Sequence, residues 1–176
     1  MQTTDTPQKA FADIRRAIKE RDLDEFLSRV NLDRFMNEAY DEATEEFSLN
    51  CNEFHALYPH DLFFQFGPGN IRSYNEKFRA VHLGFLKEFI FACFDKELAL
   101  PHKFEADQVR FAAFSFRKLY GFMKTQVTSI EERGDSALIS ITLTGNFIYR
   151  KIIGPLSFVF SLKKRDDFWR LEKIFN

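Results

Sequence analysis

Residues 137–144 read ALISITLT, and residues 156–163 read LSFVFSLK. In each stretch an apolar side chain occupies every second position, and serine, threonine or lysine fills most of the positions between. Because successive side chains of a strand point to opposite faces of a sheet, this period of two is typical of half-buried β-strands. The two stretches therefore predict a sheet with one face packed on a core.

One further strand is expected on each side of this pair. Residues 126–132 run into a turn at 133–135, and the last run of the chain places Trp169 and Leu171 on one face. Turn residues join each neighbouring pair, so the four strands predict an antiparallel meander. Gly145 lies inside a strand-like run, where a glycine often marks a bulge or bend, and the sheet is therefore expected to be curved.

Upstream of the sheet the apolar period changes to that of helices. Thr6 before a proline predicts a helix start, and this first helix is expected to end near residue 19 or 20. Asp22 opens a second, short helix, and a longer amphipathic helix begins at Asn31 or Asp33. These patterns predict helices in the N-terminal part of the chain.

Prolines and glycines between residues 58 and 69 predict a loop. Asn70 is expected to cap a long helix that ends before Pro101. Residues 107–123 fit both a helix and a strand, and we favour the helix. The whole pattern predicts one α+β domain spanning residues 1–176, with N-terminal helices packed on a C-terminal antiparallel sheet.

The composition is that of an ordinary folded protein. The chain has 176 residues, of which 45% are hydrophobic and 29% charged, and this balance suits one well-buried core. The 25 basic and 26 acidic residues leave a net charge of -1, so no overall field attracts a nucleic acid or an anionic membrane. No apolar run reaches the roughly 18 residues needed to cross a bilayer, and we expect no membrane insertion.

The cysteines and the first residues bear on localisation. Cys51 and Cys93 show no CxxC spacing, and the first five residues lack the basic and apolar segments of a signal peptide. A soluble, cytoplasmic protein is favoured. An exported protein whose leader had been removed would carry the same sequence, so export stays open.

Phenylalanine dominates the aromatic residues. It accounts for 23 of them, beside five tyrosines and one tryptophan. A phenylalanine-packed core is the first interpretation, because aromatic rings bury a large area per residue. An aromatic-lined apolar cavity is the second.

The C-terminal strands resemble those of a known superfamily. Residues 134–139 read GDSALI, and residues 168–171 read FWRL, with Trp169 as a core plug. These motifs, after a helical first half, resemble the nuclear transport factor 2-like superfamily of cystatin-like α+β cones. The resemblance is best over the last fifty residues. It implies a curved sheet folded around helices and leaves the function broad, because this fold carries enzymes, binding domains and accessory domains alike.

Four residues are candidates for catalysis in such a cone. Enzymes of the superfamily place Asp, His or Tyr inside the cone, where burial shifts a pKa towards the working range. The candidates here are Asp61, Tyr74, His82 and Tyr120. His82 lies on the apolar stripe of the long helix, where a hydrogen-bonded core histidine is the commoner role.

A ligand in a cavity between the sheet and the long helix would contact a set of mainly aromatic residues. This set is Phe78, His82, Phe85 and Trp169.

A weak metal-binding pattern lies near the predicted loop. Cys51 and His55 are four residues apart, and His60 and Asp61 follow shortly after. This spacing matches no standard zinc site, and we expect no bound metal.

Other short motifs do not indicate a function. Residues 133–135 spell the RGD tripeptide that some adhesion receptors recognise, but a hairpin turn explains it. The sequence contains no phosphate-binding loop, no dinucleotide fingerprint and no nucleophile elbow, and no motif calls for a cofactor.

Three hypotheses for the function remain. The leading one is a non-catalytic domain that binds an apolar small molecule or a protein partner, because no convergent polar set is visible. The second is a small lyase or isomerase acting in the cone pocket. The third is a structural domain that forms a homodimer through its sheet.

Overall fold

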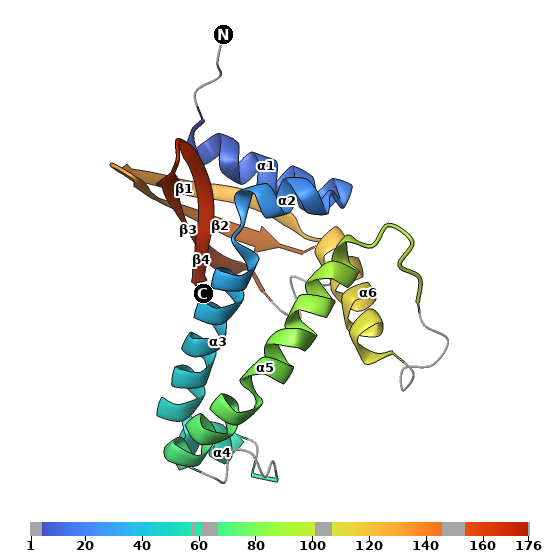
Figure 1. Ribbon diagram of the computed structural model, residues 1–176, viewed down its shortest axis with the longest axis vertical. Coiled ribbons are helices and arrows are strands. Elements are labelled where there is room, and N and C mark those ends of the chain that lie inside the picture. Colours follow the sequence, from blue (N-terminus) through green and yellow to red (C-terminus); the bar gives the residue numbers. More distant parts are fainter. Residues whose placement is uncertain (1–4, 58, 61–66, 101–106, 146–153, 176) are drawn as a thin grey trace. The chain divides into compact units, whose positions relative to one another are not determined.

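The computed structural model describes residues 5–57, 59–60, 67–100, 107–145 and 154–175 (Figure 1). In these residues six helices precede a four-stranded antiparallel sheet, which confirms the α+β class. The strands are β1 (Lys124–Arg133), β2 (Ser136–Thr144), β3 (Leu156–Arg165) and β4 (Phe168–Phe175). Their order in the sheet is β1-β2-β3-β4, with every pair antiparallel, so the predicted meander is confirmed.

Two tight turns set the register of the outer strands. Gly134, with φ +61°, turns β1 into β2, and glycine adopts this left-handed conformation without a steric cost. Asp166 and Asp167 have φ values of 50° and 65°, as in the two-residue turns that match the twist of a hairpin. The RGD tripeptide is thus part of the β1–β2 hairpin.

The ladder contains two irregularities. The register shifts between Val127 and Ser129 in β1, and between Ser161 and Leu162 in β3. Such bulges bend a strand and increase its twist. Gly145, where the sequence predicts the bend, lies directly after the end of β2, and residues 146–153 lie outside the described residues.

The first two helices start as their sequences predict. In α1 (Pro7–Glu20) the Thr6 side chain accepts a hydrogen bond from the Lys9 backbone at 3.1 Å. In α2 (Leu23–Arg29) the Asp22 side chain accepts one from the Glu25 backbone at 2.9 Å. Each cap satisfies a backbone N–H group that has no partner inside the helix.

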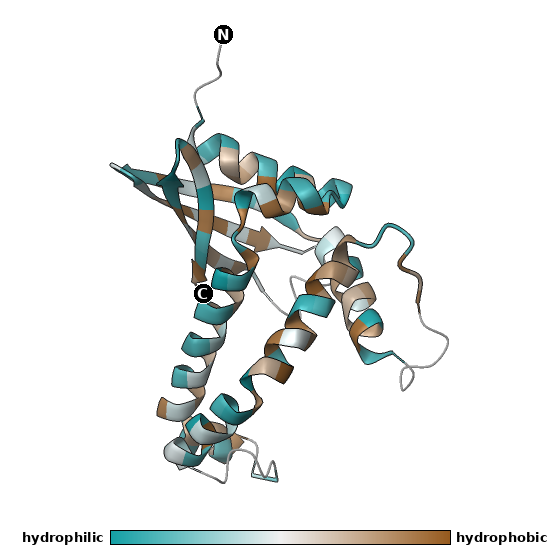
Figure 2. Cartoon of the chain, viewed as in Figure 1, coloured by the Kyte–Doolittle hydropathy of each residue, from teal (hydrophilic) through white to brown (hydrophobic). Residues whose placement is uncertain are grey.

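The core lies between α1 and one face of the sheet. Apolar residues at alternate positions of β2, together with Leu162 and Trp169, pack against Ala10 and Phe11. The rings of Phe11 and Phe160 meet edge to face, with centroids 5.1 Å apart. Trp169 is only 2% exposed, so the predicted plug is confirmed, and Figure 2 shows apolar and polar residues interspersed along the strands.

The chain divides into two compact units. The first comprises residues 1–35 and 88–176, and the second comprises residues 36–87. The remaining helices are α3 (Leu32–Leu49), α4 (Cys51–Leu57), α5 (Gly67–Phe94) and α6 (Gln108–Gly121). The sheet, α1, α2, α6 and the end of α5 belong to the first unit. The single domain expected from the composition stays a prediction.

Two of these helices bear on the sequence predictions. The helix α5 begins at Gly67, three residues before Asn70, the predicted cap. The proline at position 68 is compatible with this start, because an N–H group in the first turn has no partner inside the helix. The helix α6 confirms the favoured interpretation of residues 107–123, and the Asp107 side chain caps it by accepting from the Arg110 backbone at 2.9 Å. No helix in the described part of the chain is both long and apolar enough to span a bilayer.

Candidate functional site

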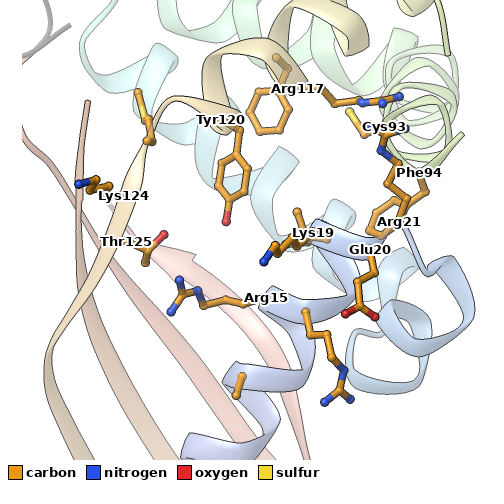
Figure 3. A pocket seen from close by; sticks show the side chains of 16 residues that line it. Arg15, Lys19, Glu20, Arg21, Cys93, Phe94, Arg117, Tyr120, Lys124 and Thr125 are labelled. Carbon is orange, nitrogen blue, oxygen red and sulfur yellow. The ribbon is translucent and has the colours of Figure 1, made fainter. Parts of the chain in front are cut away.

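The first unit contains a cavity of about 880 Å³ (Figure 3). Its walls are the C-terminal half of α1, the last residues of α5, the end of α6 and the first residues of β1. This volume lies within the range of about 300 to 1,000 Å³ that is typical of small-molecule sites.

Aromatic side chains hold part of the wall in place. Phe94 is buried, and its ring packs on Phe26 with centroids 4.8 Å apart. Phe116 meets Phe89 edge to face at 5.6 Å and stacks on Tyr120 at 6.2 Å. Such pairs restrict the rings, so this side of the cavity is an apolar surface of defined shape.

The α1 wall is formed by the helix face opposite to the core. Residues 12, 15, 16 and 19 line the cavity, and their spacing of three and four places them on one face. The core residues Ala10, Ile14 and Ala17 lie about half a turn away around the same helix. The rotation that buries the apolar face of α1 therefore turns its basic face towards the cavity.

The charge on the cavity wall is predominantly positive. Of the described residues that line the cavity, six are arginine or lysine and one, Glu20, is acidic. Arg16 has carboxylate partners in Asp13 and Glu25. Arg21 donates to the Lys96 carbonyl oxygen at 3.1 Å, and Arg117 donates to the Asp95 carbonyl oxygen at 2.8 Å. Three of the six cations are therefore already bound to oxygen atoms of the protein.

The other three cations are Arg15, Lys19 and Lys124, and none has a carboxylate partner within the described residues. The Arg15 guanidinium lies 5.9 Å from the centre of the Phe11 ring. Figure 3 shows the Lys19 amino group and the hydroxyl groups of Tyr120 and Thr125 directed into the same space. A positively charged end of the cavity thus lies beside hydroxyl donors.

Two pKa shifts describe the electrostatics of the opposite wall. Burial raises the pKa of the Cys93 thiol to about 11, against a smaller opposing effect of Arg117. Burial lowers the pKa of Arg117, and the charge of Arg21 acts in the same direction. Cys93 is therefore a neutral thiol at pH 7 and no nucleophile, whereas an arginine remains charged in proteins.

One predicted catalytic candidate lines this cavity. Tyr120, on α6, is part of the wall. Tyr74 and His82 lie on α5 in the second unit, with ring centroids 6.1 Å apart. Asp61 lies outside the described residues. The structure thus brings Tyr74 and His82 together.

The hydrogen-bonding partner of His82 is Tyr40, a residue that the sequence pattern did not identify as a site residue. The Tyr40 hydroxyl oxygen lies 2.7 Å from His82 Nδ1 and donates to the Asn75 carbonyl oxygen at 3.0 Å. A hydroxyl has one proton, so the Nδ1–H tautomer of His82 completes this arrangement by donating to Tyr40. Burial raises the pKa of Tyr40, and Arg79 opposes the shift. Tyr40 belongs to the apolar stripe of α3, but the stripe alone does not identify its partner.

The predicted ligand-binding residues lie in both units. Phe78, with its ring centroid 6.3 Å from that of His82, and Phe85, which is 56% exposed, belong to the second unit. Trp169 lies in the sheet core of the first unit. None of the predicted set lines the 880 Å³ cavity, and its role in binding stays a prediction.

The residues of the weak metal pattern show no assembled site. Cys51 is buried, and His60 is exposed. The His55 Nδ1 atom is buried, and no hydrogen-bond partner for it lies among the described residues. Asp61 lies outside the described residues, and within the described ones no three His, Cys, Asp or Glu side chains are grouped as metal ligands.

Comparison with known proteins gives no relative. No family model matches the chain, and neither a curated protein nor a solved structure does. The resemblance to the nuclear transport factor 2-like superfamily therefore stays a prediction, and the cavity itself must support any functional proposal.

Proposed function

We propose that this protein is a non-catalytic binding domain that holds a small molecule in the cavity of its first unit. The observation that carries the proposal is the cavity of about 880 Å³, which combines packed aromatic rings with basic and hydroxyl side chains. A concave site of this size, in which aromatic side chains supply contact area and polar groups orient the ligand, is the usual form of a small-molecule site.

The chemistry of the lining residues favours binding over catalysis. The part of the lining that the structure describes includes no histidine or aspartate, and its cysteine, Cys93, has a raised pKa that favours the thiol. A general base or an activated nucleophile requires a neighbouring group that takes up the proton. Among the described lining residues, the remaining acid–base candidates are Glu20, which is exposed, and Tyr120.

A bulky side chain at the α1 wall tests the proposal. Ala12 is exposed and lines the cavity, so Ala12→Trp narrows the cavity without disturbing the core. Gln8→Trp is the matched control, because Gln8 is exposed on the same helix and does not line the cavity. The probe is the uncharged dye N-phenyl-1-naphthylamine, which fluoresces strongly in apolar sites.

We expect the wild type and Gln8→Trp to enhance the dye fluorescence and Ala12→Trp to abolish the enhancement. Far-ultraviolet circular dichroism checks that both variants keep their fold. Absence of dye binding by the wild type, or equal binding by both variants, would refute the proposal.

A small lyase or isomerase is the second candidate function. The Tyr40–His82 contact at 2.7 Å supports it, because a histidine oriented by a hydrogen bond can transfer protons and Tyr74 lies beside it. The test follows exchange of the α-hydrogens of cyclohexanone for solvent deuterium by proton NMR. We expect the exchange to be lost in His82→Ala and to be unchanged in His60→Ala, a control at an exposed histidine. Exchange that persists in His82→Ala removes this candidate.

A further inference from the structure

The basic residues on the cavity wall are more numerous than the fold requires. Arg16, Arg21 and Arg117 hold carboxylates or carbonyl oxygens of the protein. Arg15 and Lys19 are one helical turn apart on α1 and have no carboxylate partner within the described part of the chain. Two like charges at this spacing destabilise a helix.

The helix dipole accounts for only part of this arrangement. Lys19 lies in the last turn of α1, where a cation is stabilised by the partial negative charge of the helix end. Arg15 lies one turn earlier, beyond the range of this effect. Its charge faces the cavity wall, where Thr125 and Tyr120 supply hydroxyl groups (Figure 3).

We infer that the ligand of this cavity is an anionic amphiphile, with a carboxylate or phosphate head group at Lys19 and Arg15 and an apolar body against Phe116 and Phe94. The inference rests on the proposed function, because it specifies what the same cavity binds. Tyr120 and Thr125 can each donate a hydroxyl hydrogen bond to an oxygen of the head group.

Charge and shape together select this ligand class. Hydrogen bonds from charged donors to an anion are shorter and stronger than neutral ones, so the head group gains most from this end of the cavity. The rings of Phe94 and Phe116 offer no hydrogen-bond partner to a polar ligand body, and contact with them removes apolar surface from water. The three lining cations that have no carboxylate partner among the described residues suit a single head group, whereas a nucleic acid would need a longer basic surface.

Displacement of the bound dye by eight-carbon probes tests the inference. Sodium octanoate and octyl phosphate carry the two head groups, and 1-octanol carries the same apolar chain without charge. The variant Arg15→Gln/Lys19→Gln removes two charges from the cavity. The control Arg133→Gln/Lys163→Gln removes two charges from exposed residues of the sheet, away from the cavity wall.

We expect at least one anion to displace the dye at a concentration about tenfold below that of 1-octanol, as one charge-assisted hydrogen bond implies. This preference should disappear in Arg15→Gln/Lys19→Gln and persist in the control. The tighter of the two anions identifies the head group. The preference should also weaken as salt is added, because exposed charges are screened.

Two different failures are distinguishable. If 1-octanol competes as well as both anions, or if the cavity variant keeps the preference, the inference is overturned while the apolar binding site stands. If the wild type binds the dye but no probe displaces it, the inference is likewise overturned and the binding site stands. If the dye is not bound at all, the proposed function fails as well.

Discussion

Arg29 is the residue whose replacement tests the packing of the first unit most directly. Its guanidinium donates to both carboxylate oxygens of Asp5 at 2.8 and 2.9 Å, to Asp13 at 2.7 Å and to the Trp169 carbonyl oxygen at 3.3 Å. The side chains of Arg29, Asp5 and Asp13 are 8%, 10% and 7% exposed. We predict that Arg29→Met strongly destabilises this unit, because it leaves two carboxylates buried without their main partner.

The size of the stability loss depends on the hydrogen-bond and ion-pair partners that Asp5 and Asp13 keep in Arg29→Met. Breaking a buried ion pair by removing one partner costs about 3 to 5 kcal/mol. Asp13 keeps Lys9 and Arg16, and Asp5 keeps a hydrogen bond from the Trp169 backbone at 2.7 Å. The expected loss therefore lies near the lower limit, at about 3 kcal/mol. With a urea dependence of about 2 kcal/mol per molar, the unfolding midpoint should fall by about 1.5 M.

Tryptophan fluorescence during urea unfolding at pH 7 measures this loss. The chain has a single tryptophan, Trp169, which lies in the core beside Arg29, so the signal reports on the unit in question. Lys9→Met is the control, because Lys9 is 44% exposed and its pair with Asp13 should contribute at most about 0.5 kcal/mol. A loss below about 1 kcal/mol in Arg29→Met would refute the reasoning.

The same ion cluster predicts a pH dependence. Burial by itself raises the pKa of Asp5 and of Asp13. Hydrogen bonds from Arg29 and from the Trp169 backbone outweigh it at Asp5, and hydrogen bonds from Lys9 and Arg29 outweigh it at Asp13, so both pKa values lie below the usual one. A carboxylate with a lowered pKa stabilises the folded state above the unfolded pKa of about 3.9, and this contribution is lost as the pH falls through the folded pKa. The stability difference between the wild type and Arg29→Met should therefore shrink below about pH 4.

Three further predictions address other parts of the chain. Because burial raises the pKa of Cys93 to about 11, iodoacetamide at pH 8 should alkylate it about 20-fold more slowly than an ordinary cysteine, as peptide mass spectrometry can measure. The lost cap in Asp107→Ala should cost about 1 kcal/mol in urea unfolding, whereas Asp107→Asn should keep most of the stability. If the sheet forms a homodimer, light scattering at high concentration should detect it and Leu138→Lys, at a position 40% exposed, should dissociate it; a monomeric wild type would end this idea.

Local signals explain why most of the sheet and the helix starts were predictable. The alternation in residues 137–144 depends on one buried face, and the caps at Thr6 and Asp22 are contacts between residues three apart. The start of α5 was predicted wrongly because the glycines and proline near residue 67 resemble a loop, although a first helical turn tolerates them. The division into two units depends on contacts between distant residues, which no local pattern records.

The candidate site was much less predictable than the fold. Tyr120 was named for its chemistry, whereas Arg15 and Lys19 were not named at all. A signal for them was present, because positions 12, 15, 16 and 19 form a second stripe on α1, on the face opposite to the apolar one. A basic stripe on a helix is most often solvated, however. This one becomes a cavity wall because the end of α6 and the start of β1, which are distant in sequence, line the same cavity.

The ion cluster and the cavity are linked through α1. Asp13 accepts hydrogen bonds from Arg29 on one side and from Arg16, which lines the cavity, on the other. Arg16 also pairs with Glu25 of α2. Since these pairs restrict the rotation of α1, they keep its apolar face on the sheet and its basic face on the cavity at the same time. The position of Arg15 and Lys19 at the cavity wall is thus a consequence of how the core is closed, and a ligand that engages them would favour the same rotation of the helix.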